Sequence, residues 1–187
     1  MNIALFASGR GSNVNNILCY FNENEKINIV VVGSNNPNSG ALDYAKKHNV
    51  PVFTFSKNEL NNSTFIINKL QKYDVSLLVL AGFLLKIPEE FISLFKGDII
   101  NVHPSLLPKY GGKGMYGDNV HKKILENGEK KSGVTFHFVN ENYDEGKIIN
   151  QYSVNITNDE TLTSLKQKIN KLEWENYPLV IESLCNE

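Results

Sequence analysis

Four short apolar runs, separated by segments with helical periodicity, constrain the fold of this chain more than any other feature. The runs are residues 2–7, 28–33, 75–80 and 98–102. An uninterrupted apolar run indicates a strand that is buried on both faces, as in a parallel sheet. Between the runs, apolar residues recur every three to four positions, which predicts crossover helices. The alternation therefore predicts an α/β fold with a doubly wound, mostly parallel sheet and a Rossmann-like N-terminal half.

The second half of the chain departs from this alternation after Pro108. A glycine-rich loop at residues 109–117 precedes a helix at 118–127, and two strands at 133–139 and 147–156 could pair antiparallel across an acidic loop. We expect a long last helix at 161–184, which Pro178 should bend or interrupt. The other expected elements are helices at 41–49, 58–73 and 88–95, a short strand at 51–55, and a helix after residue 11 that Ser12 or Asn13 could cap.

Length and composition place bounds on the class of protein. A chain of 187 residues fits a single domain, which we expect to span 1–187. Basic residues number 19 and acidic residues 20, so no basic excess points to nucleic acid. Cys19 and Cys185 are too far apart for a zinc motif and suit a reducing compartment. No signal peptide or membrane span is apparent, and we expect a cytoplasmic protein with no membrane partner; the oligomeric state is left open.

The segment 98–108 places two polar side chains at the end of a buried strand. Asn101 and His103 are two positions apart, so they share one face, and Pro104 ends the strand. Polar groups at the carboxyl ends of parallel strands are where open α/β sheets build their sites. The pair offers a hydrogen-bond donor for an oxyanion and a group that titrates near neutral pH. A structural histidine at a strand end is the alternative.

The turn between the first strand and the first helix predicts an anion site. It contains Gly9, Gly11, Ser12 and Asn13, whose amide groups at a helix N-terminus could hold a phosphate. A capped tight turn without a ligand is the alternative. A dinucleotide site is disfavoured, because position 14 is Val where that fingerprint has its third glycine, and no acidic residue closes the next strand.

Several other polar residues admit two interpretations. Asp144 could hold and charge an imidazole, or could be a solvated loop carboxylate. Asn170 and Glu173 share one helix face, which could be a site or an exposed polar stripe. His121 and His137 show no metal-ligand spacing with His103, and we interpret His137 as structural or as a supporting residue.

Taken together, these motifs resemble one family. They are residues 7–13 with Gly11-Ser12-Asn13, residues 80–83 (Leu-Ala-Gly-Phe), residues 101–108 (Asn-Val-His-Pro-Ser-Leu-Leu-Pro), Asp144-x-Gly146, and Glu173 ahead of Tyr177-Pro178. In this order and spacing the chain resembles the phosphoribosylglycinamide formyltransferases, within the superfamily of enzymes that use 10-formyltetrahydrofolate. The resemblance covers nearly the whole chain.

The resemblance implies transfer of a formyl group from 10-formyltetrahydrofolate, a co-substrate, to the primary amine of glycinamide ribonucleotide, with no metal. It implies a catalytic set of Asn101, His103 and Asp144. It implies a ribonucleotide site in which Gly11, Ser12 and Asn13 hold the phosphate and Asn170 and Glu173 contact the sugar or glycinamide portion. It implies a folate site made of Leu84, Leu85, Lys86 and Ile87, of Asn140, Glu141, Asn142, Tyr143 and Asp144, and of Asn101.

Three positions depart from the pattern of the family. Leu85 stands where a basic residue is common, Asn170 replaces the usual Gln, and residues 111–117 form a longer glycine-rich loop. Two alternatives remain. One is another formyltransferase or a formyltetrahydrofolate hydrolase, although both usually carry further domains. The other is a Rossmann-like binding module for NAD(P) without chemistry.

Overall fold

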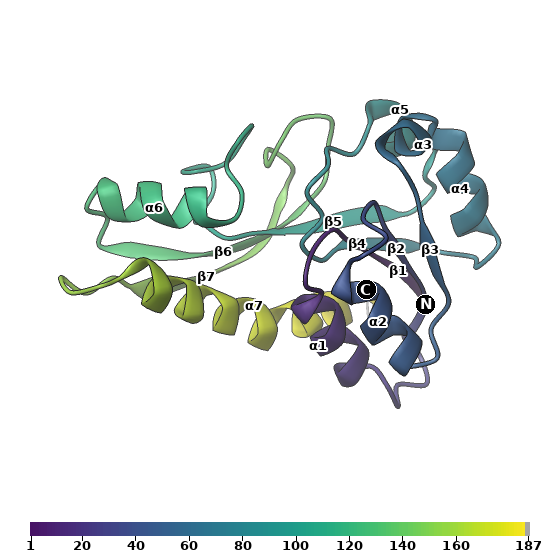
Figure 1. Ribbon diagram of the computed structural model, residues 1–187, viewed down its shortest axis with the longest axis horizontal. Coiled ribbons are helices and arrows are strands. Elements are labelled where there is room, and N and C mark those ends of the chain that lie inside the picture. Colours follow the sequence, from purple (N-terminus) through teal and green to yellow (C-terminus); the bar gives the residue numbers. More distant parts are fainter. Residues whose placement is uncertain (186–187) are drawn as a thin grey trace.

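A single seven-stranded sheet organises the protein. The computed structural model describes residues 1–185, and the last two residues of the predicted 1–187 domain lie outside them. The sheet has the order β3-β2-β1-β4-β5-β6-β7, with the first five strands parallel and β6 and β7 antiparallel to their neighbours (Figure 1). The strands are β1 (Asn2–Ala7), β2 (Asn28–Ser34), β3 (Val52–Thr54), β4 (Leu77–Leu80), β5 (Asp98–His103), β6 (Lys131–Phe138) and β7 (Ile148–Asn155). The predicted mostly parallel α/β sheet and its antiparallel C-terminal pair are confirmed.

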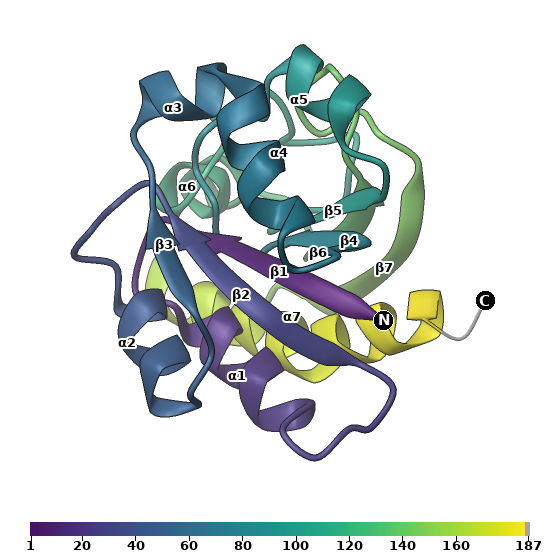
Figure 2. The same ribbon diagram turned by 90° about the vertical axis from the view of Figure 1, so that its right-hand side faces the viewer.

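Helices cover both faces of the sheet. They are α1 (Ser12–Tyr20), α2 (Gly40–Lys47), α3 (Lys57–Asn61), α4 (Ser63–Gln71), α5 (Glu89–Leu94), α6 (Asp118–Glu126) and α7 (Leu162–Cys185). Figure 2 shows α1, α2 and α7 on one face and α3, α4 and α5 on the other. Each face buries its own apolar cluster, and α6 joins the cluster of α1 and α7 through Val120 and Ile124. The parallel strands are therefore apolar on both sides, which explains their uninterrupted runs.

Two local predictions are wrong. Residues 58–73 were expected to form one helix, but Asn62 takes a non-helical conformation (φ −85°, ψ 76°) and separates α3 from α4. Asn competes for backbone hydrogen bonds and favours such turns. The N-cap of α1 is Gly11, in the left-handed region with φ 79°, and no side chain caps the helix. A Cβ at Gly11 would lie 2.4 Å from the backbone of Ala41, so the close approach of α1 to α2 requires glycine.

Pro178 lies inside α7 and does not interrupt it, contrary to one of the two predicted outcomes. Proline lacks the N–H that would bond to the carbonyl four residues earlier, which is that of Trp174. In this protein the Asn16 side chain of α1 donates a hydrogen bond of 2.8 Å to that carbonyl oxygen. A neighbouring helix thus satisfies the backbone group that the proline leaves free.

Candidate functional site

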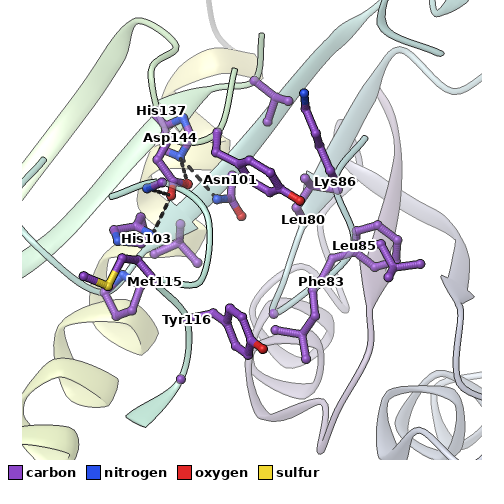
Figure 3. Close-up of a pocket in the computed structure, with 18 of the residues that line it drawn as sticks. Leu80, Phe83, Leu85, Lys86, Asn101, His103, Met115, Tyr116, His137 and Asp144 are labelled. Atoms are coloured by element: carbon purple, nitrogen blue, oxygen red, sulfur yellow. Dashed lines mark hydrogen bonds and ion pairs between the residues drawn. The ribbon is translucent and has the colours of Figure 1, made fainter. Parts of the chain in front are cut away.

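The carboxyl ends of the central strands open into one cleft of about 610 Å³. The cleft lies beside β1 and β4, where the strand order reverses direction, which is where ligands bind in open α/β sheets. Figure 3 shows Asn101, His103, His137 and Asp144 gathered on one side, with Leu80, Phe83, Leu85 and Lys86 opposite them. Asn101 and His103 both line the cleft from β5, as their spacing predicts.

His103 and Asp144 form an ion pair in the lining of the cleft. His103 is 4% exposed, and its Nδ1 lies 3.4 Å from Asp144 Oδ2. Its Nε2 donates to the Tyr110 carbonyl oxygen at 2.7 Å. Both ring nitrogens therefore face oxygens that only accept hydrogen bonds, an arrangement that an imidazolium with two N–H groups satisfies. The Gly112 N–H also donates to Asp144 Oδ2, at 2.9 Å, which fixes the carboxylate from the side of the glycine-rich loop.

His137 belongs to the same cluster, and the sequence analysis gave it only a structural or supporting role. It is 2% exposed, and its Nδ1–H donates to the Phe138 carbonyl oxygen at 2.8 Å. Its Nε2 therefore accepts, and the Asn101 amide nitrogen donates to it at 3.2 Å. Burial lowers the pKa of His137, which keeps the ring neutral. The antiparallel register that pairs Asn101 with His137 creates this contact, and no motif spacing indicates it.

The predicted ribonucleotide residues come from opposite ends of the chain. Asn13 of α1 donates a 2.7 Å hydrogen bond to Glu173 Oε2 of α7, and Asn170 lines the same wall of the cleft. Burial raises the pKa of Glu173 to about 7, and the hydrogen bond from Asn13 opposes this rise. Gly11 and the exposed Ser12 lie at the start of α1 next to Asn13, although neither lines the cleft. The predicted stripe of Asn170 and Glu173 therefore faces the cleft.

The predicted folate residues line the cleft from two other segments of the chain. Leu84, Leu85, Lys86 and Ile87 all line the cleft, as do Asn140, Asn142, Tyr143 and Asp144, whereas Glu141 is exposed and lies outside the lining. The Leu84 N–H donates to Ser8 Oγ at 2.9 Å, which ties this segment to the end of β1. The Lys86 ammonium lies over the Tyr143 ring, 5.4 Å from its centroid.

Residues 112–117 form a wall that the motifs did not assign to any role. Met115 and Tyr116 of this segment line the cleft and are labelled in Figure 3. Gly112, Gly114 and Gly117 adopt positive φ angles. The density of glycine in this segment was the available signal, because such backbones favour loops that approach a ligand.

Residues 1–185 contain no group of three or more His, Cys, Asp or Glu side chains arranged to hold a metal ion. No helix within the described part of the chain is both long and apolar enough to cross a membrane.

Comparisons with known proteins give one consistent result. The sequence profile of the Formyl transferase family matches residues 1–181. The chain is 37% identical to the chloroplastic phosphoribosylglycinamide formyltransferase of Arabidopsis thaliana, over 99% of this chain and 65% of that protein. It is 35% identical to the phosphoribosylglycinamide formyltransferase of Bacillus subtilis, over 97% of this chain and 93% of that protein.

Solved structures agree. The phosphoribosylglycinamide formyltransferase of Anaplasma phagocytophilum superposes with a TM-score of 0.90 at 32% identity, covering 99% of this chain and 86% of that one. The chain spans 65% and 61% of the length of the two plant relatives, and 93% of the Bacillus subtilis protein. By sequence and by structure, this chain belongs to the formyl transferase family, in the group of phosphoribosylglycinamide formyltransferases.

Proposed function

We propose that this protein transfers a formyl group from 10-formyltetrahydrofolate to the primary amine of glycinamide ribonucleotide, in purine biosynthesis. The observation that carries the proposal is the cluster of Asn101, His103 and Asp144 in the lining of one cleft, in a chain of this family. The reaction needs stabilisation of an oxyanion, and this cluster presents an amide donor and a paired imidazole.

The chemistry begins when the amine attacks the formyl carbon and the carbonyl oxygen becomes an oxyanion. One N–H of the Asn101 amide is held by His137, so the second N–H of the same group is available to the oxyanion. The His103 imidazolium, held by Asp144, adds a positive charge nearby. In a comparable site, each such donor contributes about 3–4 kcal/mol to the stability of the transition state.

A proton must also pass from the amine to the departing folate nitrogen. The Nε2–H of His103 is used by the Tyr110 carbonyl oxygen, and its Nδ1 is paired with the Asp144 carboxylate at 3.4 Å. We therefore assign the transfer to water, with His103 as an electrostatic group. Holding both substrates in one cleft adds a gain in effective concentration.

The walls of the cleft divide naturally between the two substrates. The ribonucleotide phosphate would lie on the amide groups of Gly11, Ser12 and Asn13, with its sugar or glycinamide portion at Asn170 and Glu173. The pterin would lie against residues 84–87, Asn101 and residues 140–144, where Glu141 contributes through its backbone. We propose residues 1–187 as one formyltransferase domain in the cytoplasm, with folate as co-substrate and without metal, nucleic acid or membrane partners.

The test is a formyl-transfer assay with both substrates, followed by the absorbance of the folate product. His103→Ala and Asp144→Ala are assayed alongside the wild-type protein. We expect turnover by the wild type and a loss of at least about a hundredfold in each variant. Release of folate with another amine, or with water alone, would support a different acceptor or a hydrolase, and would discard the ribonucleotide half of the proposal.

A further inference from the structure

Tyr116 is an aromatic residue of the cleft to which the proposed function gives no role. It lies in the glycine-rich segment 112–117, lines the cleft, and is 55% exposed. In Figure 3 its ring points into the cleft, toward the side from which Phe83 and Leu85 project. A ring that is this exposed in the wall of a cleft offers apolar surface that a ligand can bury.

Two other Phe or Tyr residues line the cleft, and both already have partners for their rings. Phe83 is buried and packs against two other phenylalanines, whose ring centroids lie 5.5 and 5.9 Å from its own. The Tyr143 ring lies under the Lys86 ammonium. Within residues 1–185, no aromatic ring or cation packs on Tyr116 in this way. Its ring is therefore the one in this lining that is left for a ligand.

The backbone of the segment presents Tyr116 to the cleft. Met115 packs against the apolar cluster of α1 and α7, whereas Tyr116, the next residue, is exposed. Gly114 and Gly117 flank this pair with φ 85° and 57°, and a Cβ at either position would meet no atom within 4 Å. These two glycines therefore serve the backbone conformation and not close packing.

The same segment begins beside the proposed catalytic set. The Gly112 N–H donates to Asp144 Oδ2 at 2.9 Å, and the Met115 N–H donates to the Gly112 carbonyl oxygen at 3.0 Å. Residues 112–115 thus form a tight turn, whose first and last Cα atoms lie less than about 7 Å apart. Tyr116 follows this turn directly, so it lies close to the carboxylate that pairs with His103.

Of the two proposed substrates, only the folate contains aromatic rings. Its p-aminobenzoyl ring is bonded to N10, the nitrogen that carries the formyl group. When the formyl group lies at Asn101 and His103 for transfer, this ring must lie next to them. The pterin is farther from N10, beyond a methylene group, and its proposed site is residues 84–87 and 140–144. The p-aminobenzoyl ring is therefore the flat apolar group that matches the position of Tyr116.

We propose that the Tyr116 ring stacks on the p-aminobenzoyl ring of the folate co-substrate. The inference rests on the proposed function, because that function brings N10 of the folate to Asn101 and His103. Stacked aromatic rings attract each other by more than the burial of their area. The contact adds affinity for the folate, adds none for the ribonucleotide, and selects co-substrates that carry an aromatic ring on N10.

The test compares two substitutions at Tyr116 with one control. Tyr116→Ala removes the ring, whereas Tyr116→Phe keeps the ring and removes the hydroxyl. Tyr20→Ala is the control, because Tyr20 is 46% exposed and lies outside the cleft. Calorimetry gives the Kd for glycinamide ribonucleotide, for tetrahydrofolate, and for tetrahydropteroate, which lacks the glutamate. Displacement titration gives the Kd for 6-methyltetrahydropterin, which lacks the p-aminobenzoyl ring, and thermal unfolding gives the Tm of each free protein.

We expect Tyr116→Ala to raise the Kd for tetrahydrofolate and for tetrahydropteroate about threefold to tenfold, because both carry the p-aminobenzoyl ring. The Kd for 6-methyltetrahydropterin and the Kd for the ribonucleotide should stay the same. Tyr116→Phe should bind each ligand like the wild type, and so should Tyr20→Ala. The Tm of the free Tyr116 variants should match that of the wild type, because substitutions of exposed side chains change stability little.

An unchanged tetrahydrofolate Kd in Tyr116→Ala would overturn the inference. An equal loss of affinity for 6-methyltetrahydropterin would overturn it too, because the contact would then not be with the p-aminobenzoyl ring. An equal loss in Tyr116→Phe would assign the contact to the hydroxyl and not to stacking. The proposed function fails separately, if wild-type protein binds tetrahydrofolate but transfers no formyl group to the ribonucleotide. In that case the comparison of Kd values still decides the inference.

Discussion

The imidazole of His137 decides how the amide of Asn101 is oriented. Its Nδ1–H is used by the Phe138 carbonyl, so its Nε2 can only accept and the Asn101 amide must present its nitrogen. This residue therefore acts through Asn101, as a positioning residue. An exchange of the amide oxygen and nitrogen of Asn101 would direct a lone pair at the oxyanion.

We expect His137→Phe to lower kcat about tenfold with little change in KM, because the lost contact serves the transition state. Steady-state kinetics measure both constants. His137→Gln, which can present an amide oxygen as acceptor to Asn101, should recover part of kcat. His48→Phe, at the end of α2 and outside the cleft, is the matched control. A KM effect without a kcat effect would contradict the positioning role.

Glu173 makes stability depend on pH. Its pKa is about 7 in the folded protein and near 4.5 ordinarily, so the folded state holds a proton that the unfolded state releases between these values. Its contribution to stability is therefore lost as pH rises through this window. Burial lowers the pKa of His121 to about 4, so the pH dependence of its contribution to stability is the opposite: that contribution is lost as pH falls below 6.5.

Comparing Glu173→Gln with wild type isolates the effect that ionisation of this carboxyl group has on stability. We expect the stability of the variant, relative to wild type, to increase by about 2–3 kcal/mol between pH 5 and pH 8. Urea unfolding of both proteins at the two pH values measures this difference. The hydrogen bond from Asn13 can persist to the Gln oxygen, so packing is preserved. The same difference at both pH values would show that Glu173 is ionised throughout.

At the scale of elements, the hydrogen bond between α1 and α7 gives the clearest test of how the helices are held together. Asn16→Ala would leave the Trp174 carbonyl without the donor that replaces the missing proline N–H. We expect a loss of about 1 kcal/mol in the free energy of unfolding, despite the better helix propensity of Ala. Denaturant titration measures it. Asn15→Ala, one position along α1, should be neutral or stabilising, and an equal effect of both changes would dismiss the carbonyl contact.

The sequence predicted where helices and strands lie better than it predicted where helices end or continue. The apolar runs located the buried strands, because burial on both faces leaves a signal within each segment. For the opposite reason, the break at Asn62 was missed, and the sequence did not decide whether Pro178 bends α7 or interrupts it. Each depends on a local backbone choice or on a partner from a distant helix, and neither leaves a periodic pattern.

At the scale of the whole molecule, the cleft exists only through contacts between distant segments. Asn13 meets Glu173 across 160 residues, and Asn101 meets His137 through sheet register. Motifs and resemblance identified most of these positions individually. The sequence could not supply the pairings, since they depend on strand order and on how α7 packs beside α1.

Because the cleft draws on both ends of the chain and on the central strands, ligand binding should stabilise the entire fold. A ligand present at a hundred times its Kd adds about 2.7 kcal/mol to the free energy of unfolding. For a chain of this size, we expect a rise in Tm of about 5–11 °C. Glycinamide ribonucleotide and a reduced folate analogue should each produce it, and the two together should produce more, because they occupy different walls. NADH should leave Tm unchanged, since the turn after β1 lacks the third glycine of a dinucleotide site. Thermal unfolding monitored by fluorescence measures Tm in all four conditions on aliquots of one protein preparation. A rise in Tm with NADH alone would replace formyl transfer with the nucleotide-binding alternative.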